Sequence, residues 1–107
     1  MGFVRLDWGE GYYSDTGGDD APLLFLHGTG CDSRDWDGGV AELPEGVRAV
    51  LMDFRGHGRS DVPGGPFTLA GLADDVLARV DRLELGGGVL VGHSLGGMVA
   101  LDAASRS

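Results

Sequence analysis

The sequence predicts an α/β fold in which a β-hairpin precedes a parallel sheet. Three short, nearly continuous apolar runs, at residues 22–26, 47–52 and 89–91, have the composition of strands buried on both faces. A segment with helical character follows each run. Because strands that alternate with helices pair in parallel, we expect a hairpin followed by three strand–helix units.

The hairpin is predicted from the first residues of the chain. Apolar and polar residues alternate loosely from Phe3 to Trp8, and Tyr12-Tyr13 favours a second strand. We expect the turn at Gly9-Glu10-Gly11, because glycine accepts the backbone angles of tight turns.

A short helix is expected after the first apolar run, over residues 33–43. Trp36, Val40 and Leu43 recur there at helical spacing, and Pro44 closes the segment. Trp36 is the expected packing anchor of this helix.

The longest helix is predicted from Leu69 to Leu83. Its apolar residues form one stripe, and Thr68 is suited to cap its first turn. Asp75 and Arg79 are four residues apart and are expected to pair on a more polar face. A last helix is predicted from Leu95 to Ser105, a segment rich in helix-forming residues.

Composition excludes several classes of protein. The 107 residues suffice for one modest domain, and no apolar run approaches the length of a membrane span. A formal net charge of −9 argues against nucleic acid or an anionic membrane as a partner, since both attract basic patches. The single cysteine, Cys31, gives neither an internal disulfide nor a metal framework. The first ten residues contain no long apolar stretch, so a cytoplasmic location is expected.

Polar clusters bracketed by glycine follow each of the three predicted parallel strands. They lie at residues 27–29, 53–60 and 92–97. Ligands of open parallel sheets bind at the carboxyl ends of the strands. We therefore expect the three clusters to meet at one edge of the sheet and to form the functional site.

The third cluster has the G-x-S-x-G spacing of a nucleophile elbow, with Ser94 at the tip of the turn. Gly92 and Gly96 are expected to lack side chains because the turn between strand and helix is tight. The N–H of Leu95 would bind an oxyanion at the start of the following helix. A second N–H is expected from the loop His27-Gly28-Thr29, with Thr29 as the donor.

With these motifs the chain resembles the α/β-hydrolase superfamily. Residues 24–28 match the strand and loop of the oxyanion hole, residues 53–60 the end of the next strand, and residues 91–97 the elbow. The resemblance covers nearly the whole chain and is closest to esterase-, lactonase-, C–C-hydrolase- and cofactor-free haloperoxidase-like members. It implies hydrolysis of a small ester, lactone or similar carbonyl substrate by a serine nucleophile, with no cofactor and no metal.

The rest of the family's catalytic triad is not found in these residues. In the family an acid and then a histidine follow the nucleophile in the chain, but residues 95–107 contain Asp102 and no histidine. His93 is expected to point away from the hydroxyl, and His27 to help hold the oxyanion loop. Residues 1–107 are therefore interpreted as the N-terminal portion of one hydrolase domain, with the C-terminal half absent.

Two consequences are expected from this interpretation. The chain alone should show little triad-type catalysis, because loss of one triad member costs orders of magnitude in rate. The strand at residues 89–91, interior in a complete sheet, should lie at or near an open edge. An exposed apolar edge favours self-association.

Other functions stay open at this point. An acyltransferase could use the same elbow, and His27 and Asp32 have a short H-x4-D spacing. A dinucleotide-binding domain would use the G-x-G of residues 28–30 and Asp53, although Ser33 takes the place of the third glycine. A non-catalytic, truncated fragment would account for where the chain stops.

Several polar residues have a simpler interpretation than catalysis. Ser94 could be only a helix cap, although its flanking residues favour the elbow. Asp53 is expected to be a turn-forming carboxylate at a strand end. Arg55, His57 and Arg59 are expected to organise their loop through hydrogen bonds.

Overall fold

The computed structural model describes residues 2–18, 20–65 and 67–106. They form a five-stranded sheet of order β1-β2-β4-β3-β5 with helices on its faces. The strands are β1 (Gly2–Leu6), β2 (Gly9–Asp15), β3 (Leu23–Leu26), β4 (Ala49–Met52) and β5 (Val89–Gly92). β3 pairs in parallel with β4 and β5, whereas β2 pairs antiparallel with β1 and β4. The predicted α/β class and the parallel pairing are confirmed, and the hairpin makes the sheet mixed.

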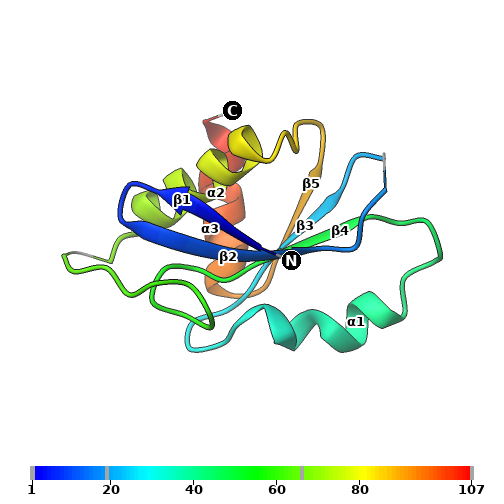
Figure 1. The fold of residues 1–107 in the computed structure, drawn as a ribbon, viewed down its shortest axis with the longest axis horizontal. Helices are drawn as coiled ribbons and strands as arrows, with labels where there is room; N and C mark the ends of the chain where they lie inside the picture. Colours follow the sequence, from blue (N-terminus) through cyan, green and yellow to red (C-terminus); the bar gives the residue numbers. More distant parts are fainter. Residues whose placement is uncertain (1, 19, 66, 107) are drawn as a thin grey trace.

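Helices cover the two faces of the sheet unequally (Figure 1). The helices α2 (Leu69–Arg82) and α3 (Leu95–Ser105) lie on one face. The short 3-10 helix η1 (Ser33–Trp36) and the helix α1 (Asp37–Ala41) lie on the other. The β3 side chains alternate accordingly, because Leu24 and Leu26 belong to the core under α2 and α3, while Phe25 packs with Trp36.

The main core lies between the sheet and α2 with α3. Its fully buried members come from four elements and include Leu24, Leu26, Val50, Met52, Leu72, Val76 and Val99. Thr68 caps α2 as predicted, since its hydroxyl accepts a hydrogen bond of 3.0 Å from the N–H of Gly71. Because Leu72 and Val76 belong to this core, the apolar stripe predicted for α2 faces the sheet.

The turn of the hairpin is not where the sequence predicted it. Leu6 pairs with Gly9 at the end of the β1–β2 ladder, so the chain turns at Asp7 and Trp8 and not at Gly9-Glu10-Gly11. The indole Nε1 of Trp8 donates a hydrogen bond of 2.9 Å to Asp75 in α2. This contact with a distant helix anchors the turn, and nothing in the local sequence indicates it.

The predicted pair of Asp75 and Arg79 on a polar face is wrong, because both side chains are buried. Asp75 binds the guanidinium of Arg55 through hydrogen bonds of 2.6 and 2.7 Å. Arg79 donates to the carbonyl of Asp53 at 2.6 Å. Burial lowers the pKa of Arg79 to about 10, so the side chain stays charged at neutral pH.

The helix expected over residues 33–43 is shorter and less regular than predicted. It begins as the 3-10 helix η1, which is capped by Asp32 through a 2.8 Å bond from the N–H of Arg34. The α-helical part ends at Ala41. Gly38 and Gly39 lie in α1 and lower its helix propensity, which accounts for the short length.

The strand β5 lies at the edge of the sheet, as expected. Its partner is β3, and Val89 is 59% exposed while Leu90 and Val91 are half-buried. Burial on both faces, which the apolar run predicted, is therefore not found. Met98 and Leu101 of the neighbouring helix α3 are also exposed. Among the described residues, no helix has both the length and the apolar character needed to cross a bilayer.

Candidate active site

Ser94 occupies the sharp turn between β5 and α3. Its φ of 56° and ψ of −116° lie outside the conformations that residues other than glycine favour. The helix α3 begins at the next residue, Leu95, and the serine is exposed. This strand, turn and helix have the local geometry of a nucleophile elbow.

Two glycines allow this turn to form. A methyl group on Gly92 would collide with the backbone of Gly96. A methyl group on Gly96 would collide with the carbonyl of Leu26 and would lie 2.7 Å from the carbonyl oxygen of His27. The first turn of α3 therefore packs directly on the backbone at the end of β3.

The loop after β3 lies beside the serine. A methyl group on Gly28 would lie 3.6 Å from the Cβ of Ser94. Within residues 2–18, 20–65 and 67–106, no hydrogen-bond acceptor is found for the backbone N–H groups of Thr29 and Leu95. The two predicted oxyanion donors thus lie on segments that adjoin the serine, and neither N–H has an acceptor among the described residues.

His27 joins the loop after β3 to the loop after β4. Its Nδ1 donates a hydrogen bond of 2.7 Å to the carbonyl of Gly28, and its Nε2 accepts one of 3.0 Å from the N–H of Phe54. Because a carbonyl can only accept and an amide N–H can only donate, these partners assign a neutral ring protonated at Nδ1. Burial lowers the pKa of His27, which favours the same neutral form.

Asp53 forms the turn after β4, as predicted, and also joins that turn to the start of η1. Its carboxylate accepts hydrogen bonds of 2.7 Å from the N–H of Ser33 and 2.9 Å from the N–H of Arg59. Asp53 is only 2% exposed. A carboxylate that is buried and bonded in this way is not free to bind a ribose, so the dinucleotide-binding alternative loses its acidic residue.

The other polar residues of the loop after β4 also bind protein groups. Arg55 pairs with Asp75, and Arg59 donates to the hydroxyl of Tyr12 at 3.1 Å. The imidazole of His57 binds the carbonyl of Arg55 and the N–H of Gly30. The expectation that Arg55, His57 and Arg59 organise the loop is therefore confirmed.

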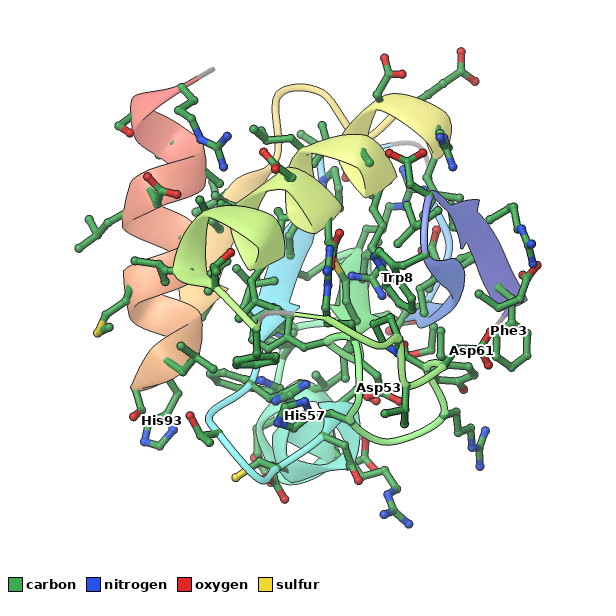
Figure 2. The ribbon with its side chains drawn as sticks, turned by 90° about the vertical axis from the view of Figure 1, so that its left-hand side faces the viewer. Phe3, Trp8, Asp53, His57, Asp61 and His93 are labelled. Atoms are coloured by element: carbon green, nitrogen blue, oxygen red, sulfur yellow. The ribbon has the colours of Figure 1, made fainter. Side chains whose placement is uncertain are left out.

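In the described part of the chain, no histidine is hydrogen-bonded to Ser94. Both ring nitrogens of His27 and of His57 are engaged by other groups. His93 is exposed at the base of α3, and Figure 2 shows it at the same end of the molecule as His57. Asp102 contacts Arg106, the residue that follows α3, at 3.4 Å.

A hollow of about 460 Å³ lies beside the elbow. Its walls come from the loop after β3, from η1 and from the elbow, through His27, Gly28, Cys31, Asp35, Trp36 and His93. Asp35 raises the pKa of the Cys31 thiol, which keeps this thiol neutral and weakly nucleophilic. No three His, Cys, Asp or Glu side chains among the described residues are arranged to hold a metal ion.

Comparison with known proteins agrees with the geometry of the elbow. A model of the alpha/beta hydrolase family matches residues 23–107. The chain belongs to this family. The match begins at β3 and runs through the elbow and α3, so it contains all three polar clusters that the sequence placed at the strand ends.

Relatives and solved structures of this family resemble nearly all of the chain. It is 44% identical over 100 residues to a bifunctional esterase/perhydrolase from Acinetobacter calcoaceticus and 41% identical over 100 residues to a non-heme chloroperoxidase from Streptomyces lividans. Each alignment covers 91% of this chain and 36% of the relative. The enol-lactonase structure from Burkholderia xenovorans has a TM-score of 0.88 and 32% identity, covering 97% of this chain and 41% of that one.

The chain thus spans about a third of the length of the curated relatives that it matches. Those proteins contain far more residues than are present here. The activities in their names describe the whole proteins.

Two tertiary contacts of the site could not be predicted from the sequence. Nothing in the periodicity of α2 indicated that Arg79 is buried below Asp53. The bond between His57 and Gly30 joins segments 27 residues apart. A signal for a crowded loop was present in Gly58, where a methyl group would collide with the carboxylate of Asp53.

The glycines of the elbow give a direct test of this packing. Gly96→Ala should lower the free energy of unfolding by more than about 2 kcal/mol, because its methyl group meets the backbone of β3. Gly97→Ala is the matched control, since the nearest atom to its methyl group would be 3.6 Å away and alanine favours helix by about 1 kcal/mol. Urea denaturation measures both changes. Equal stability of the two variants would contradict the close contact.

The buried neutral imidazole of His27 predicts a dependence of stability on pH. Its pKa in the folded chain lies below the ordinary value of 6.5, so the unfolded chain binds the proton first as the pH falls. Stability supplied by the neutral ring is therefore complete above about pH 6.5 and is lost as the pH falls through the folded pKa. Urea denaturation from about pH 7 to about pH 5 should show a steeper loss for the unsubstituted chain than for His27→Asn. Parallel pH curves would contradict a buried neutral His27.

Proposed function

We propose that this chain carries the nucleophile and the oxyanion hole of a serine hydrolase that acts on ester, lactone or similar carbonyl substrates. Ser94 attacks the carbonyl carbon, and the backbone N–H groups of Leu95 and Thr29 bind the resulting oxyanion. The observation that carries the proposal is the strained Ser94 at the start of α3, beside a loop whose N–H at Thr29 has no acceptor in the described fold.

The surrounding residues support this role in different ways. Gly92 and Gly96 allow the turn, and the carbonyl of His93 accepts a hydrogen bond of 3.0 Å from the N–H of Gly96. His27 and Gly28 hold the oxyanion loop. The N-terminus of α3 adds a positive electrostatic potential at the position of the oxyanion. Loss of one oxyanion donor typically lowers kcat by about 10² to 10³.

The general base and its acid are proposed to come from outside these 107 residues. Supporting observations are the engaged nitrogens of His27 and His57 and the contact of Asp102 with Arg106. We further propose that residues 1–107 form the N-terminal portion of one hydrolase domain. On its own the chain should hydrolyse esters only near the uncatalysed rate, because an unactivated serine hydroxyl is a weak nucleophile.

The substrate class is proposed from the hollow beside the elbow and from the relatives. An esterase/perhydrolase and an enol-lactonase, by their names, act on esters and lactones. The same elbow can pass an acyl group to an alcohol in place of water. Product analysis with an added alcohol separates hydrolysis from acyl transfer.

A chimera tests the role of Ser94. Residues 1–107 would be joined to the C-terminal part of the Acinetobacter esterase/perhydrolase, with which the chain shares 44% identity. Hydrolysis of 4-nitrophenyl acetate is expected, and Ser94→Ala should lower it by about 10³-fold or more. The matched control is Ser105→Ala on the exposed end of α3. Turnover that survives Ser94→Ala, or an inactive folded chimera, would contradict the proposed role of Ser94 as the nucleophile.

The free edge of β5 is proposed to mediate contact between copies of the chain. Exposed apolar side chains on and beside this edge, Val89, Met98 and Leu101, support the proposal.

Sedimentation velocity tests this contact. Association should increase with protein concentration and should be reduced by Val89→Lys. Val62→Lys is the control, because Val62 is 79% exposed and belongs to the loop between β4 and α2, outside β5 and α3. Equal reduction by both variants, or a monomer at every concentration, would rule out contact through this edge.

A further inference from the structure

Two imidazoles join the loop after β3 to the loop after β4, one from each loop. His27 donates to Gly28 in its own loop and accepts from Phe54 in the other. His57 makes the corresponding two bonds from the loop after β4, donating within its own loop and accepting from the loop after β3. Its Nδ1 donates to the carbonyl of Arg55 at 3.0 Å, and its Nε2 accepts from the N–H of Gly30 at 3.1 Å.

The partners of the two rings lie on either side of Thr29. The carbonyl of Gly28 belongs to the same peptide as the Thr29 N–H, and the two groups of a trans peptide point in opposite directions. This carbonyl accepts from His27 and, at 3.1 Å, from the N–H of Cys31, and the two bonds set one side of the residue. The N–H of Gly30 belongs to the peptide that follows Thr29, and the bond to His57 sets the other side.

Packing does little to hold this part of the loop. Thr29 and Gly30 are both exposed, and a methyl group on Gly30 would meet no atom within 4 Å. Gly30 has a φ of +75°, a left-handed conformation that glycine can leave without steric cost. Among the described residues, the bond to His57 is the hydrogen bond that restrains the N–H of Gly30.

His57 is itself held in place, so it can act as a fixed acceptor. Its Nδ1 is bound to the backbone of Arg55, whose side chain is locked on Asp75 of α2 by two short hydrogen bonds. The ring also packs on His27, with centroids 5.0 Å apart, and on Phe67, with centroids 5.9 Å apart. The exposed loop is thereby connected to the buried Asp75 of α2.

We propose that His57 is a positioning residue that directs the oxyanion donor Thr29, because its Nε2 holds the N–H of Gly30 in the adjoining peptide. This inference rests on the proposed function, in which Thr29 supplies the second donor of the oxyanion hole. His57 touches neither the nucleophile nor the substrate in this role. It acts through the orientation of the loop.

Nuclear magnetic resonance on the ¹⁵N-labelled chain tests the bond and its effect without any need for turnover. A scalar coupling across the hydrogen bond is expected between the Gly30 amide nitrogen and His57 Nε2. His57→Phe should speed exchange of the Gly30 amide with water by roughly 5- to 10-fold, as loss of a bond worth about 1 kcal/mol predicts. The residual dipolar coupling of the Thr29 N–H should change at the same time.

His57→Gln is the matched variant, because its side-chain oxygen keeps an acceptor for Gly30. It should restore slow exchange and the Thr29 dipolar coupling in large part. The amide of Ser33, bound to Asp53 in the same loop, is the internal reference and should not change in either variant. An unchanged Thr29 dipolar coupling in His57→Phe would overturn the proposal.

Kinetics of the chimera described above give a second readout. His57→Phe should lower kcat by about 10- to 100-fold with little change in KM, since a misdirected donor weakens binding of the transition state only. His57→Gln should recover most of the loss. A rise in KM at constant kcat would contradict positioning of the oxyanion donor. Loss of Ser94-dependent turnover in the unsubstituted chimera would instead count against the proposed function, and the dipolar couplings would still decide the role of His57.

Discussion

At Gly96 the first turn of α3 packs backbone to backbone on the end of β3, with no side chain between them. The register of the sheet places Leu26 opposite Gly92, so the elbow begins level with the last residue of β3. Any larger residue at Gly96 would push the helix away from the sheet and move Ser94 away from the loop that follows β3. The closeness of the serine to Gly28 is therefore a property of the sheet and its helix, and the loops are built around it.

The loops at this end of the sheet are held by polar groups that reach across from one strand end to the next. Asp53 binds backbone N–H groups on both sides of itself, and His27 and His57 bridge the same two loops. Exposed loops with little packing gain rigidity from such bonds because each one restrains backbone that would otherwise be mobile. Below them, Arg79 leaves its Nε and Nη1 without a partner among the described residues, which is a cost in stability at the base of the site.

Local constraints explain what could be predicted from the sequence. The elbow is a backbone requirement, and its glycines and apolar flanks are visible within the ten residues from Val89 to Met98. The three parallel strands were equally plain, since each is a short apolar run. The errors at the hairpin turn and at the charged residues of α2 share one physical feature, which is contact between segments far apart in the chain. Trp8, in the observed turn, reaches Asp75 across 67 residues.

The burial of the charged residues of α2 also could not be predicted from the sequence. Helical spacing correctly places Asp75 and Arg79 near one another, but charge alone predicts a solvent-exposed face. In the fold their charges are matched by Arg55 and by the carbonyl of Asp53, which only the tertiary structure brings close. Burial of charge is permitted where such partners exist, so sequence patterns predict the periodicity of a helix better than the face it turns inward.

The exposed edge of β5 and the net charge of −9 would have opposite effects on the proposed contact between two copies of the chain. Apolar contact at the edge is attractive at short range, whereas the repulsion between like-charged copies extends over the Debye length. That length is about 10 Å at 0.1 M ionic strength and about 3 Å at 1 M. Added salt weakens the repulsion and leaves the apolar attraction in place. Ionic strength would therefore control how strongly the acidic surface opposes association through β5.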